Sequence, residues 1–572
     1  MGTNFRNLVE LYESSVDRYA DNQLFGTRHT EGWRWITYGE FGKQVDHARG
    51  GLAGLGIESG DRVAVISDNR VEWAIGAYAT YGLGAAWVPM YEAQLAKEWE
   101  FILGNSGAKI AIVGDDGIRA QLDDLRKDLP ELGQIVVIRG EAGGDSISWA
   151  EMQARGADNP IDTVEPASED LACLIYTSGT TGQPKGVMLS HGNITSNVNV
   201  FPDMFDIGPD DRTASFLPWA HSFGQTIDLH FMIGAGASAG LTSAQTLMDD
   251  LADLKPTILV SVPAVYNRLY DALQKMMAAK GGVTRTLFDR ALANEQKRAG
   301  LAADGKTTRW VEMQHDMYDK LVFSKVRNGF GGQLRYSISG GAAISVEVAE
   351  FISALGLTVY EGYGLTETSP VAAANTPSYR KVGSIGKEIP GVTIDIDREL
   401  TDDPEIGELI IHGPNVMLGY FNLPEENERR SPPTVASAPV TSAIATTMGS
   451  CSSGDASRSN TSSRTANTSC RHPLRSNSNC PAMSRTSWCT ESSDRTTWPS
   501  SSQTWTRSRS GRPTTVSAIS PARLCSRATR SLICTNARLT VCPVQSRGTS
   551  RCAGSCSRTR SSRPRTGCSL RA

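Results

Sequence analysis

Apolar residues recur at two different spacings along the first 430 residues of the chain. Helical spacing, in which every third or fourth residue is apolar, runs through residues 5–19 and again through residues 41–55, and predicts two amphipathic helices. Shorter apolar runs rich in β-branched residues predict buried strands at Arg62–Ile66, Ala86–Val88, Lys109–Val113, Gln134–Ile138, Leu171–Tyr176, Thr257–Val262, Leu334–Ser339 and Leu357–Tyr360. Helical lengths separate most of these runs. This alternation predicts an α/β fold with layered, mainly parallel sheets between helices.

Two stretches depart from this rhythm. Residues from about 265 to 333 are mostly helical and too long for a connector, so they predict a helical insertion. From about residue 381 to 425, short strands alternate with Gly and Pro turns, which predicts a small β-barrel-like or antiparallel subdomain. No stretch approaches the roughly 18 consecutive apolar residues of a membrane-spanning helix, and no secretory signal opens the chain. We therefore expect a cytoplasmic protein.

The net charge of −4 conceals two dissimilar segments. Residues 1–430 carry 37 Lys and Arg against 58 Asp and Glu, whereas residues 431–572 carry 20 Arg, no Lys and three acids. The second segment has no Phe or Tyr, is about a quarter Ser, and holds all the cysteines except Cys173. It cannot bury enough apolar surface to offset the entropy of ordering, so we expect it to be disordered. Cys173 is expected to be a buried apolar residue without redox function.

The strongest chemical signal directly follows the predicted strand at 171–176. It reads Tyr176-Thr177-Ser178-Gly179-Thr180-Thr181-Gly182-Gln183-Pro184-Lys185-Gly186. Glycines let backbone N–H groups approach an anion, hydroxyls can donate to phosphate oxygens, and Lys185 supplies positive charge. The residues predict a phosphate-binding loop. It is not a Walker A loop, because Pro184 and Gly186 flank the lysine where that motif needs Gly and Ser or Thr.

This loop and four later motifs, in order, resemble those of the adenylate-forming enzymes, which include acyl-CoA synthetases, aryl-CoA ligases, luciferases and peptide-synthetase adenylation domains. The later motifs are Leu217-Pro218-Trp219-Ala220-His221-Ser222-Phe223-Gly224, Ser339-Gly340-Gly341-Ala342, Tyr360-Glu361-Gly362-Tyr363-Gly364-Leu365-Thr366-Glu367-Thr368, and Gly407-Glu408-Leu409 with Gly413-Pro414 and Gly419-Tyr420. The resemblance covers residues 1–428, which we interpret as the large N-terminal domain of that family. The helical insertion and the phrase at 318–327 look most like long-chain fatty acyl-CoA synthetases.

The resemblance implies a role for each motif. The adenine pocket would be lined by Gly340, Gly341, Ala342, Glu361, Gly362, Tyr363 and Gly364, with Tyr363 stacking on the base. The phosphates would be bound by Thr177, Ser178, Gly179, Thr180, Thr181 and Gly182. Lys185, Thr366, Glu367 and His221 would act in catalysis, with His221 at the mouth of the acyl pocket. Mg²⁺, which favours one or two carboxylates plus phosphate oxygens, would be held by Glu367 and Thr177. Trp219 is expected to be core.

The small C-terminal domain of the family is not recognisable after Glu428. Its Thr-Gly-Asp segment, its Gly-Arg hinge and its catalytic Lys are all missing from the sequence. If the reading frame slipped near Arg429, however, Arg430 to Ser442 would fit Ala-Phe-(Ala/Thr)-x-Asp-Gly-x-Leu-Arg-Thr-Gly-Asp-Ile. We therefore interpret residues 429–572 as out-of-frame translation. The alternatives are a natural Arg/Ser-rich linker and a basic tail that binds RNA or membranes.

These inferences together predict an AMP-forming fatty acid–CoA ligase, impaired as written. Its ligands would be ATP, Mg²⁺, coenzyme A and a fatty acid, with no specific nucleic acid and with room for peripheral membrane association. One alternative is a nucleotide- and acyl-binding remnant without turnover. Another is a different adenylate-forming activity, either an aryl-CoA ligase or a peptide-synthetase adenylation domain.

Overall fold

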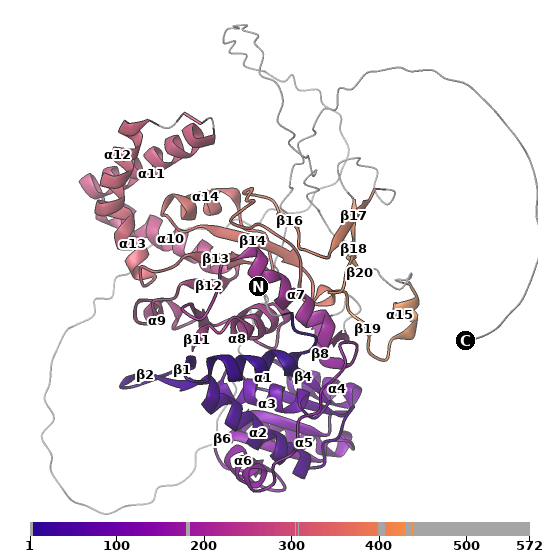
Figure 1. The fold of residues 1–572 in the computed structure, drawn as a ribbon. Coiled ribbons are helices and arrows are strands. Elements are labelled where there is room, and N and C mark those ends of the chain that lie inside the picture. The colour runs from indigo at the N-terminus through magenta and orange to yellow at the C-terminus, as the bar shows by residue number, and fades with distance from the viewer. Residues whose placement is uncertain are drawn as a thin grey trace, which may run out of the picture. The chain divides into compact units, whose positions relative to one another are not determined.

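A computed structural model of the chain describes residues 4–178, 183–303, 305–306, 308–398, 407–429 and 436–438. Within these residues, strands form layered, mainly parallel sheets flanked by helices, which confirms the predicted fold class (Figure 1). Each of the eight predicted strand runs contains a strand. The pattern missed mainly strands at sheet edges and in hairpins, where alternation with polar residues is weaker.

One sheet of eight strands is built mostly from the first 190 residues. Its order is β19 (Gly419–Tyr420), β9 (Pro184–Ser190), β8 (Leu171–Ser178), β4 (Ala86–Met90), β3 (Arg62–Ile66), β5 (Ile110–Asp115), β6 (Gln134–Arg139) and β7 (Ile147–Ser148). Neighbours from β8 through β7 are parallel, whereas β9 is antiparallel to both of its neighbours, β8 and β19. The late strand β19 thus joins an early sheet.

A second sheet of nine strands carries most of the later motifs. Its order is β16 (Lys387–Glu388), β15 (Val371–Ala374), β14 (Val359–Gly364), β13 (Tyr336–Ser339), β12 (Ile258–Ser261), β10 (Arg212–Ser215), β11 (Ser238–Leu241), β1 (Gln23–His29) and β2 (Gly32–Thr37). The central strands are parallel and both edges are antiparallel. The carboxyl ends of parallel strands in such a sheet are where ligands usually bind.

Helices flank the sheets, some of them starting at side-chain caps. They are α1 (Leu8–Tyr19), α2 (Tyr38–Gly54), α3 (Val71–Tyr81), α4 (Ala96–Ser106), α5 (Asp116–Leu125), α6 (Trp149–Asp158), α7 (His191–Met204), α8 (Met232–Gly234), α9 (Leu247–Leu254), α14 (Val346–Ala354) and α15 (Pro424–Arg429), with short turns η1 (Arg126–Asp128), η2 (Gly224–Phe231) and η4 (Thr366–Thr368). In α2, Thr37 and Glu40 form a reciprocal capping box. Helices α1 and α2 lie where helical spacing predicted them.

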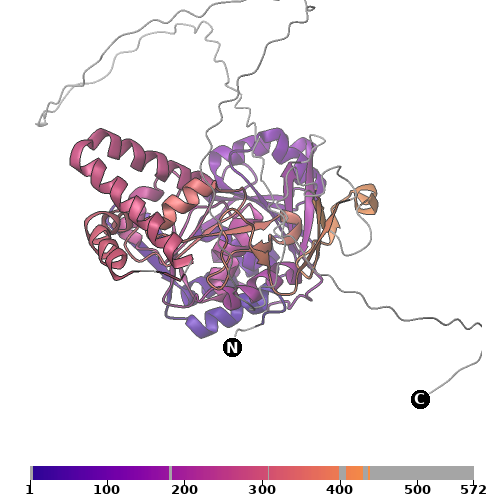
Figure 2. The ribbon, with the colours of Figure 1, turned by 90° about the horizontal axis from the view of Figure 1, so that it is seen from above.

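The stretch expected to form a helical insertion contains four helices and one π-helical turn. These are α10 (Pro263–Lys280), α11 (Gly282–Ala303), α12 (Arg309–Tyr318), η3 (Asp319–Phe323) and α13 (Ser324–Gly329). Figures 1 and 2 show these rose-coloured helices extending to one side of the sheets. Trp310 on α12 is 62% exposed, so part of this insertion faces away from the body.

The stretch expected to form a small β-rich subdomain contributes to three sheets. Strands β17 (Thr393–Asp397), β18 (Glu408–His412) and β20 (Ala436–Ala438) form an antiparallel sheet of their own, whereas β16 and β19 extend the two large sheets. Strand β20 is a correction to the sequence-based expectation of disorder from residue 429 onward, because its backbone pairs with β18. The other residues after Arg429 lie outside the described part of the chain.

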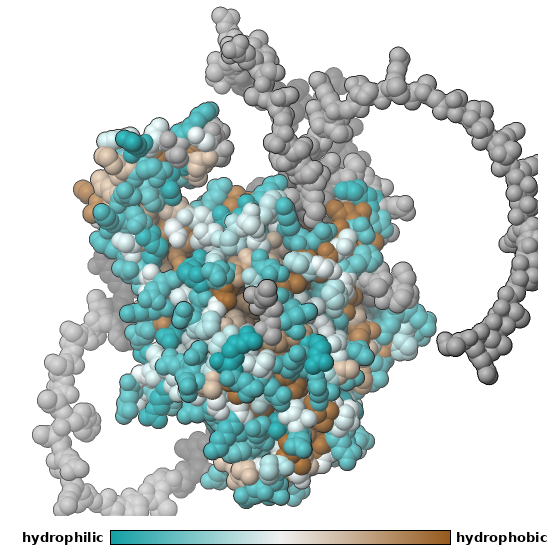
Figure 3. Space-filling model, viewed as in Figure 1, coloured by the Kyte–Doolittle hydropathy of each residue, from teal (hydrophilic) through white to brown (hydrophobic). Residues whose placement is uncertain are grey.

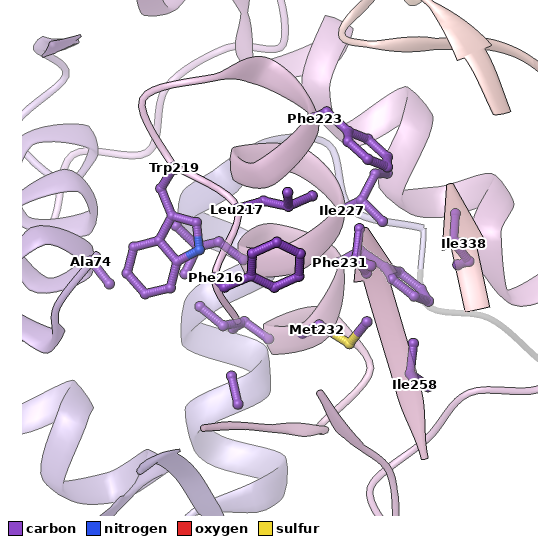
Figure 4. Packing of buried hydrophobic residues seen from close by; sticks show 14 of the residues in the cluster. Ala74, Phe216, Leu217, Trp219, Phe223, Ile227, Phe231, Met232, Ile258 and Ile338 are labelled. Atoms are coloured by element: carbon purple, nitrogen blue, oxygen red, sulfur yellow. The ribbon is translucent and has the colours of Figure 1, made fainter. Parts of the chain in front are cut away.

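Apolar clusters cover both faces of the eight-stranded sheet. Successive side chains along a strand point to opposite faces, so each strand contributes to both clusters. Val63 and Val65 of β3 pack in the cluster that includes α2 and α3, whereas Ala64 and Ile66 pack with α4 and α5. The first cluster continues into the nine-stranded sheet, where the loop after β10 and η2 pack on β12 and β13 (Figure 4). Trp219 is 0% exposed in this region, which confirms it as core.

Candidate functional site

A cavity of about 270 Å³ opens at the carboxyl ends of β13 and β14. Three separate stretches supply one side of its wall. These are the turn after β13 (Gly340, Gly341), β14 with its following turn (Gly362 to Glu367), and the segment His221 to Phe223. Three motifs that are far apart in sequence therefore meet at one edge of the nine-stranded sheet.

The glycines of these motifs are required by close packing. A Cβ on Gly340 would lie 3.0 Å from the Phe223 ring, and a Cβ on Gly364 would lie 1.7 Å from the Pro370 carbonyl oxygen. Gly341 has a φ of +79°, in the left-handed region that side chains rarely adopt. The backbone itself thus forms much of the cavity wall, as a flat ligand would need.

The remaining adenine-pocket candidates divide into two groups. Gly362 and Tyr363 line the cavity, and burial raises the pKa of the Tyr363 phenol. Ala342 and Glu361 are not among the lining residues. Ala342 is exposed, and the Glu361 carboxylate accepts a hydrogen bond from the Ile344 amide at 3.3 Å. Burial raises the pKa of Glu361. Glu361 therefore braces the turn behind the cavity rather than facing into it.

Glu367 and Lys185 are brought together by a residue that sequence reasoning did not select. The Tyr420 hydroxyl donates to Glu367 Oε1 at 2.7 Å, and Lys185 Nζ lies 5.4 Å from the centroid of the same ring. Lys185 also donates to Glu426 Oε2 at 2.8 Å, in an ion pair with both side chains largely buried. The Gly-Tyr motif was visible in the sequence, but only folding shows that its tyrosine joins the two sheets at the site.

The predicted phosphate loop is part of a β-hairpin. Strand β8 continues through Thr177 and Ser178, β9 begins at Pro184, and Thr177 lies opposite Lys185 in the antiparallel pairing. The sequence pattern had treated Lys185 as a loop residue, which is corrected here because Lys185 belongs to a strand. Thr177 is half-buried and Ser178 exposed, and neither is among the cavity-lining residues. Gly179, Thr180, Thr181 and Gly182 lie outside the described residues.

His221 and Thr366 both line the cavity. The Phe223 amide donates to His221 Nδ1 at 3.2 Å, and the Ser222 hydroxyl donates to Thr366 Oγ1 at 3.4 Å. Solvent reaches His221, yet the protein around it desolvates the charged form and lowers its pKa. A neutral His221 with Nδ1 accepting leaves Nε2 as the donor.

Apolar side chains cover the other side of the cavity. Phe201 from α7 and Phe205, directly after that helix, lie there with Ile338, Tyr360 and Val371. The Phe205 ring packs edge-on against Tyr360, with ring centroids 5.5 Å apart. The cavity thus has a polar side near Glu367 and an apolar side beneath it, which suits an amphipathic ligand.

Three buried asparagines hold the loop around Glu367, and no sequence pattern singled them out apart from the motifs beside them. The Asn415 amide donates to the carbonyls of Thr368 and Val371, at 3.1 and 2.9 Å. Asn197 accepts from the Val371 amide at 3.0 Å, and Asn193 donates to two carbonyls flanking Asn415. Because buried backbone groups need partners, these amides fix the loop's position.

The residues proposed for Mg²⁺ fit a metal that arrives with phosphate. No group of three or more His, Cys, Asp or Glu side chains suited to a metal occurs among the described residues. Mg²⁺ commonly takes only one or two protein carboxylates and completes its shell with water and phosphate oxygens. Glu367 is half-buried at the cavity wall and one of its oxygens accepts from Tyr420, which fits a single carboxylate ligand.

Two further observations concern Cys173 and the possibility of a membrane span. Cys173 is buried, and burial raises the pKa of its thiol to about 12, which confirms its apolar role. None of the helices in the described part of the chain is long and apolar enough to cross a membrane.

Known proteins resemble this chain in sequence. A long-chain-fatty-acid–CoA ligase, FadD15 of Mycobacterium bovis, is 33% identical over 411 residues, covering 68% of this chain and 64% of the relative. The peroxisomal long chain acyl-CoA synthetase 7 of Arabidopsis thaliana is 30% identical over 455 residues, covering 74% and 62%. The chain thus spans less than two thirds of the length of these curated relatives.

Solved structures show the same fold. A long-chain-fatty-acid-CoA ligase, FadD1 of Archaeoglobus fulgidus, superposes with a TM-score of 0.59 at 19% identity, over 75% of this chain and 80% of that one. The anthranilate CoA ligase AuaEII, in complex with anthranoyl-AMP, gives 0.59 at 21% identity, over 76% and 74%. The sequence pattern of one family, described as AMP-binding enzyme, matches residues 12–421. This chain therefore belongs to the AMP-binding enzyme family, as the ordered motifs implied.

Proposed function

We propose that the described residues form the ATP- and carboxylate-binding part of an AMP-forming acyl-CoA ligase. In the first step a carboxylate attacks the α-phosphorus of ATP, which yields an acyl-adenylate and pyrophosphate. In the second step the coenzyme A thiolate attacks the acyl carbon, which yields a thioester and AMP. The observation that carries this proposal is the cavity itself, in which Tyr363, Glu367 and His221 share one wall with paired glycines.

Several residues in and beside the cavity have a place in the first step. The adenine lies on the Gly340–Gly341 backbone and stacks on Tyr363. Lys185 exchanges its ion pair with Glu426 for the phosphates, whose charge it neutralises as the displacement proceeds. Glu367 and the Thr177 hydroxyl would hold Mg²⁺, which would supply positive charge to offset that of the phosphates. The protein contributes mainly positioning and preorganised charge.

We further propose a long-chain fatty acid as the substrate. Its carboxylate would lie near His221, where Nε2 can donate to it, and its chain would follow the apolar side formed by Phe201 and Phe205. The names of the relatives at 30–33% identity support this choice over an aryl acid. The anthranilate ligase, at 21% identity, supports the fold alone.

Both steps need groups that are not recognisable after Glu428. By resemblance, the Asp of the Thr-Gly-Asp segment holds the ribose and the Lys neutralises charge during adenylation, whereas the thioester step needs a small domain that can rotate. These features reappear in part only when the frame is shifted. We therefore propose that the 572-residue chain binds ATP weakly and forms no measurable acyl-CoA. The alternative function is a protein that binds nucleotide and acyl group without turnover.

The test compares two proteins. One is the chain as it stands, and the other has the frame restored near codon 429 and is extended through the missing Lys. Thioester formation is measured with coenzyme A, ATP and fatty acids of graded length, beside an aryl acid. We expect turnover only in the restored protein and only with fatty acids. Turnover by the chain as it stands would contradict the impairment, and inactivity of a folded, ATP-binding restored protein would contradict the proposed ligase.

A further inference from the structure

A short loop carries His221 to the cavity, and most of that loop is buried. Leu217 and Trp219 are 6% and 0% exposed, so they lie beneath the mostly hydrophilic outer face that Figure 3 shows. In Figure 4 these two side chains and Phe223 project from the same segment, just before η2. Because His221 lies between Trp219 and Phe223 in sequence, the path of the backbone here decides where its imidazole lies.

Asn69 holds this loop from the other sheet. It follows the carboxyl end of β3 in the eight-stranded sheet, and its side chain is half-buried. Its Nδ2 donates to the Leu217 carbonyl at 2.7 Å, and its Oδ1 accepts from the Trp219 amide at 2.8 Å. One side-chain amide thus pairs with the backbone on both sides of Pro218, as a neighbouring strand would. The Trp219 ring anchors the loop in the core, whereas Asn69 sets the direction of the backbone at Pro218.

The carbonyl of Pro218 passes this constraint on to His221. It accepts from the His221 amide at 3.0 Å, which closes a tight turn. The same oxygen would lie 2.4 Å from a Cβ on Gly224, so the turn has no spare room on that side. Asn69 itself is not among the residues that line the cavity. It therefore acts on His221 through one turn of backbone, without meeting a ligand.

The other polar contacts of this loop constrain it less. Nδ1 of His221 accepts from the Phe223 amide at 3.2 Å, but that bond lies within the loop, so it turns the ring without placing the loop. The Ser222 hydroxyl lies 3.4 Å from Thr366 Oγ1, which is a long contact to the nine-stranded sheet. Short hydrogen bonds are stronger than long ones, so the two bonds made by Asn69 are the firmer constraint.

We propose that Asn69 is a positioning residue for the acyl-binding side of the cavity, because it holds the loop so that Nε2 of His221 faces the carboxylate or acyl carbonyl of the ligand. This inference rests on the proposed function, which is what gives His221 a ligand. It predicts a loss of affinity confined to the acyl part of that ligand. The nucleotide part, which meets Gly340 and Tyr363 on the nine-stranded sheet, should bind as before.

The test uses the full chain and two probes, ATP and hexadecanoyl-sulfamoyl adenosine, a stable mimic of the acyl-adenylate. In titration calorimetry Asn69→Ala should bind the mimic about fivefold more weakly, the equivalent of one hydrogen bond, with its ATP affinity unchanged. Asn199→Ala is the matched control, because Asn199 is also half-buried and makes the same pair of bonds, both at 2.9 Å, to the backbone of Phe5. It should leave both affinities unchanged.

A double-mutant cycle separates positioning from general support of the fold. Since Asn69 acts through His221, Asn69→Ala should have no further effect on mimic binding in a His221→Ala protein. Hydrogen exchange over residues 219–223 should be faster in Asn69→Ala than in the unaltered chain. Asn69→Asp keeps the shape of the side chain but sets an oxygen against the Leu217 carbonyl, so it should show the same loss and serves if Asn69→Ala does not fold.

Each outcome decides the matter. Equal losses of ATP and mimic affinity, unchanged mimic affinity, unchanged exchange over 219–223, or the same loss in the His221→Ala protein would overturn the proposal. So would failure of both Asn69 variants to fold, because Asn69 would then support the fold as a whole. Failure of the unaltered chain to bind the mimic, although it is folded and binds ATP, would instead refute the proposed function, and the role of Asn69 with it.

Discussion

The two sheets contribute to the site in different ways. The nine-stranded sheet supplies a wall of backbone in which Gly340 and Gly364 have no room for a side chain, and Asn415, between β18 and β19, fixes the neighbouring loop. The eight-stranded sheet supplies one cation, Lys185, held by Glu426 through an ion pair. The first wall is preformed before any ligand arrives. The second must exchange one anionic partner for another.

The largest effect is expected at the exchangeable cation. In the frame-restored protein, Lys185→Ala should slow pyrophosphate formation by about 10²–10³, because one electrostatic contact to the developing charge is lost. Lys109→Ala, which removes an ion-paired lysine far along the same sheet, should leave the rate unchanged. The rate is followed by pyrophosphate release, and an unaltered rate in Lys185→Ala would remove this lysine from the mechanism.

The companion change tests whether Glu426 competes with phosphate. Glu426→Gln keeps the shape of the side chain and removes its charge, so it should leave Lys185 more available and tighten ATP binding. Titration calorimetry on the 572-residue chain measures this directly. Weaker binding in Glu426→Gln would show that Glu426 positions the lysine rather than competing for it.

The second largest effect is on the free energy of unfolding and comes from one buried acidic side chain. Asp228 on η2 is 0% exposed, and burial raises its pKa to about 7 although hydroxyls of Ser215 and Thr213 donate to it. The folded protein therefore holds this proton at pH values where the unfolded chain has lost it. Stability from this group is full below about pH 4 and is lost as the pH rises through about 7, by roughly 4 kcal/mol.

Urea unfolding at a series of pH values checks this sign. Asp228→Asn should remove the decline between about pH 4 and 7, whereas Asp203→Asn, an exposed acid on α7, should keep it. Parallel stability curves for Asp228→Asn and the unaltered chain would rule out Asp228 as the source.

The third effect comes from overfilling the preformed wall. In Gly364→Ala the new methyl would meet the Pro370 carbonyl, so the turn must shift, at a cost of roughly 1–3 kcal/mol in unfolding free energy. Gly208→Ala is the matched control, since nothing lies within 4 Å of its added Cβ. Urea denaturation should separate the two variants, and equal midpoints would mean that the turn adapts freely.

The smallest effect is expected where the two walls meet. Tyr420→Phe removes the hydroxyl that donates to Glu367 and keeps the ring beside Lys185. Loss of one hydrogen bond to a carboxylate should weaken Mg·ATP binding by about fivefold, or about 1 kcal/mol. Binding is measured by calorimetry with and without Mg²⁺, and a loss that is equal without Mg²⁺ would assign the hydroxyl to the phosphates or the fold instead.

The sequence predicted the fold class and most of the central strands, because buried parallel strands are often continuous apolar runs, as in Arg62–Ile66. It missed the interior strands β10 and β11, which are short and made mostly of small or polar residues. It also predicted the cavity glycines and Tyr363, since these lie in compact motifs. It missed that Lys185 lies in a strand of a hairpin, because the Gly- and Thr-rich sequence before it has the composition of a loop. It could not show that Tyr420 meets Glu367, 53 residues earlier, since that contact depends on β19 joining the other sheet.

The shared phenol ring of Tyr420 has a thermodynamic consequence. It touches the carboxylate proposed for the metal and lies beside the lysine proposed for phosphate, on a strand of only two residues. Any ligand that tightens one contact changes the position of the ring for the other. Occupancy of the two positions should therefore be cooperative, and by linkage the factor by which Mg²⁺ improves nucleotide affinity must equal the factor by which nucleotide improves Mg²⁺ affinity.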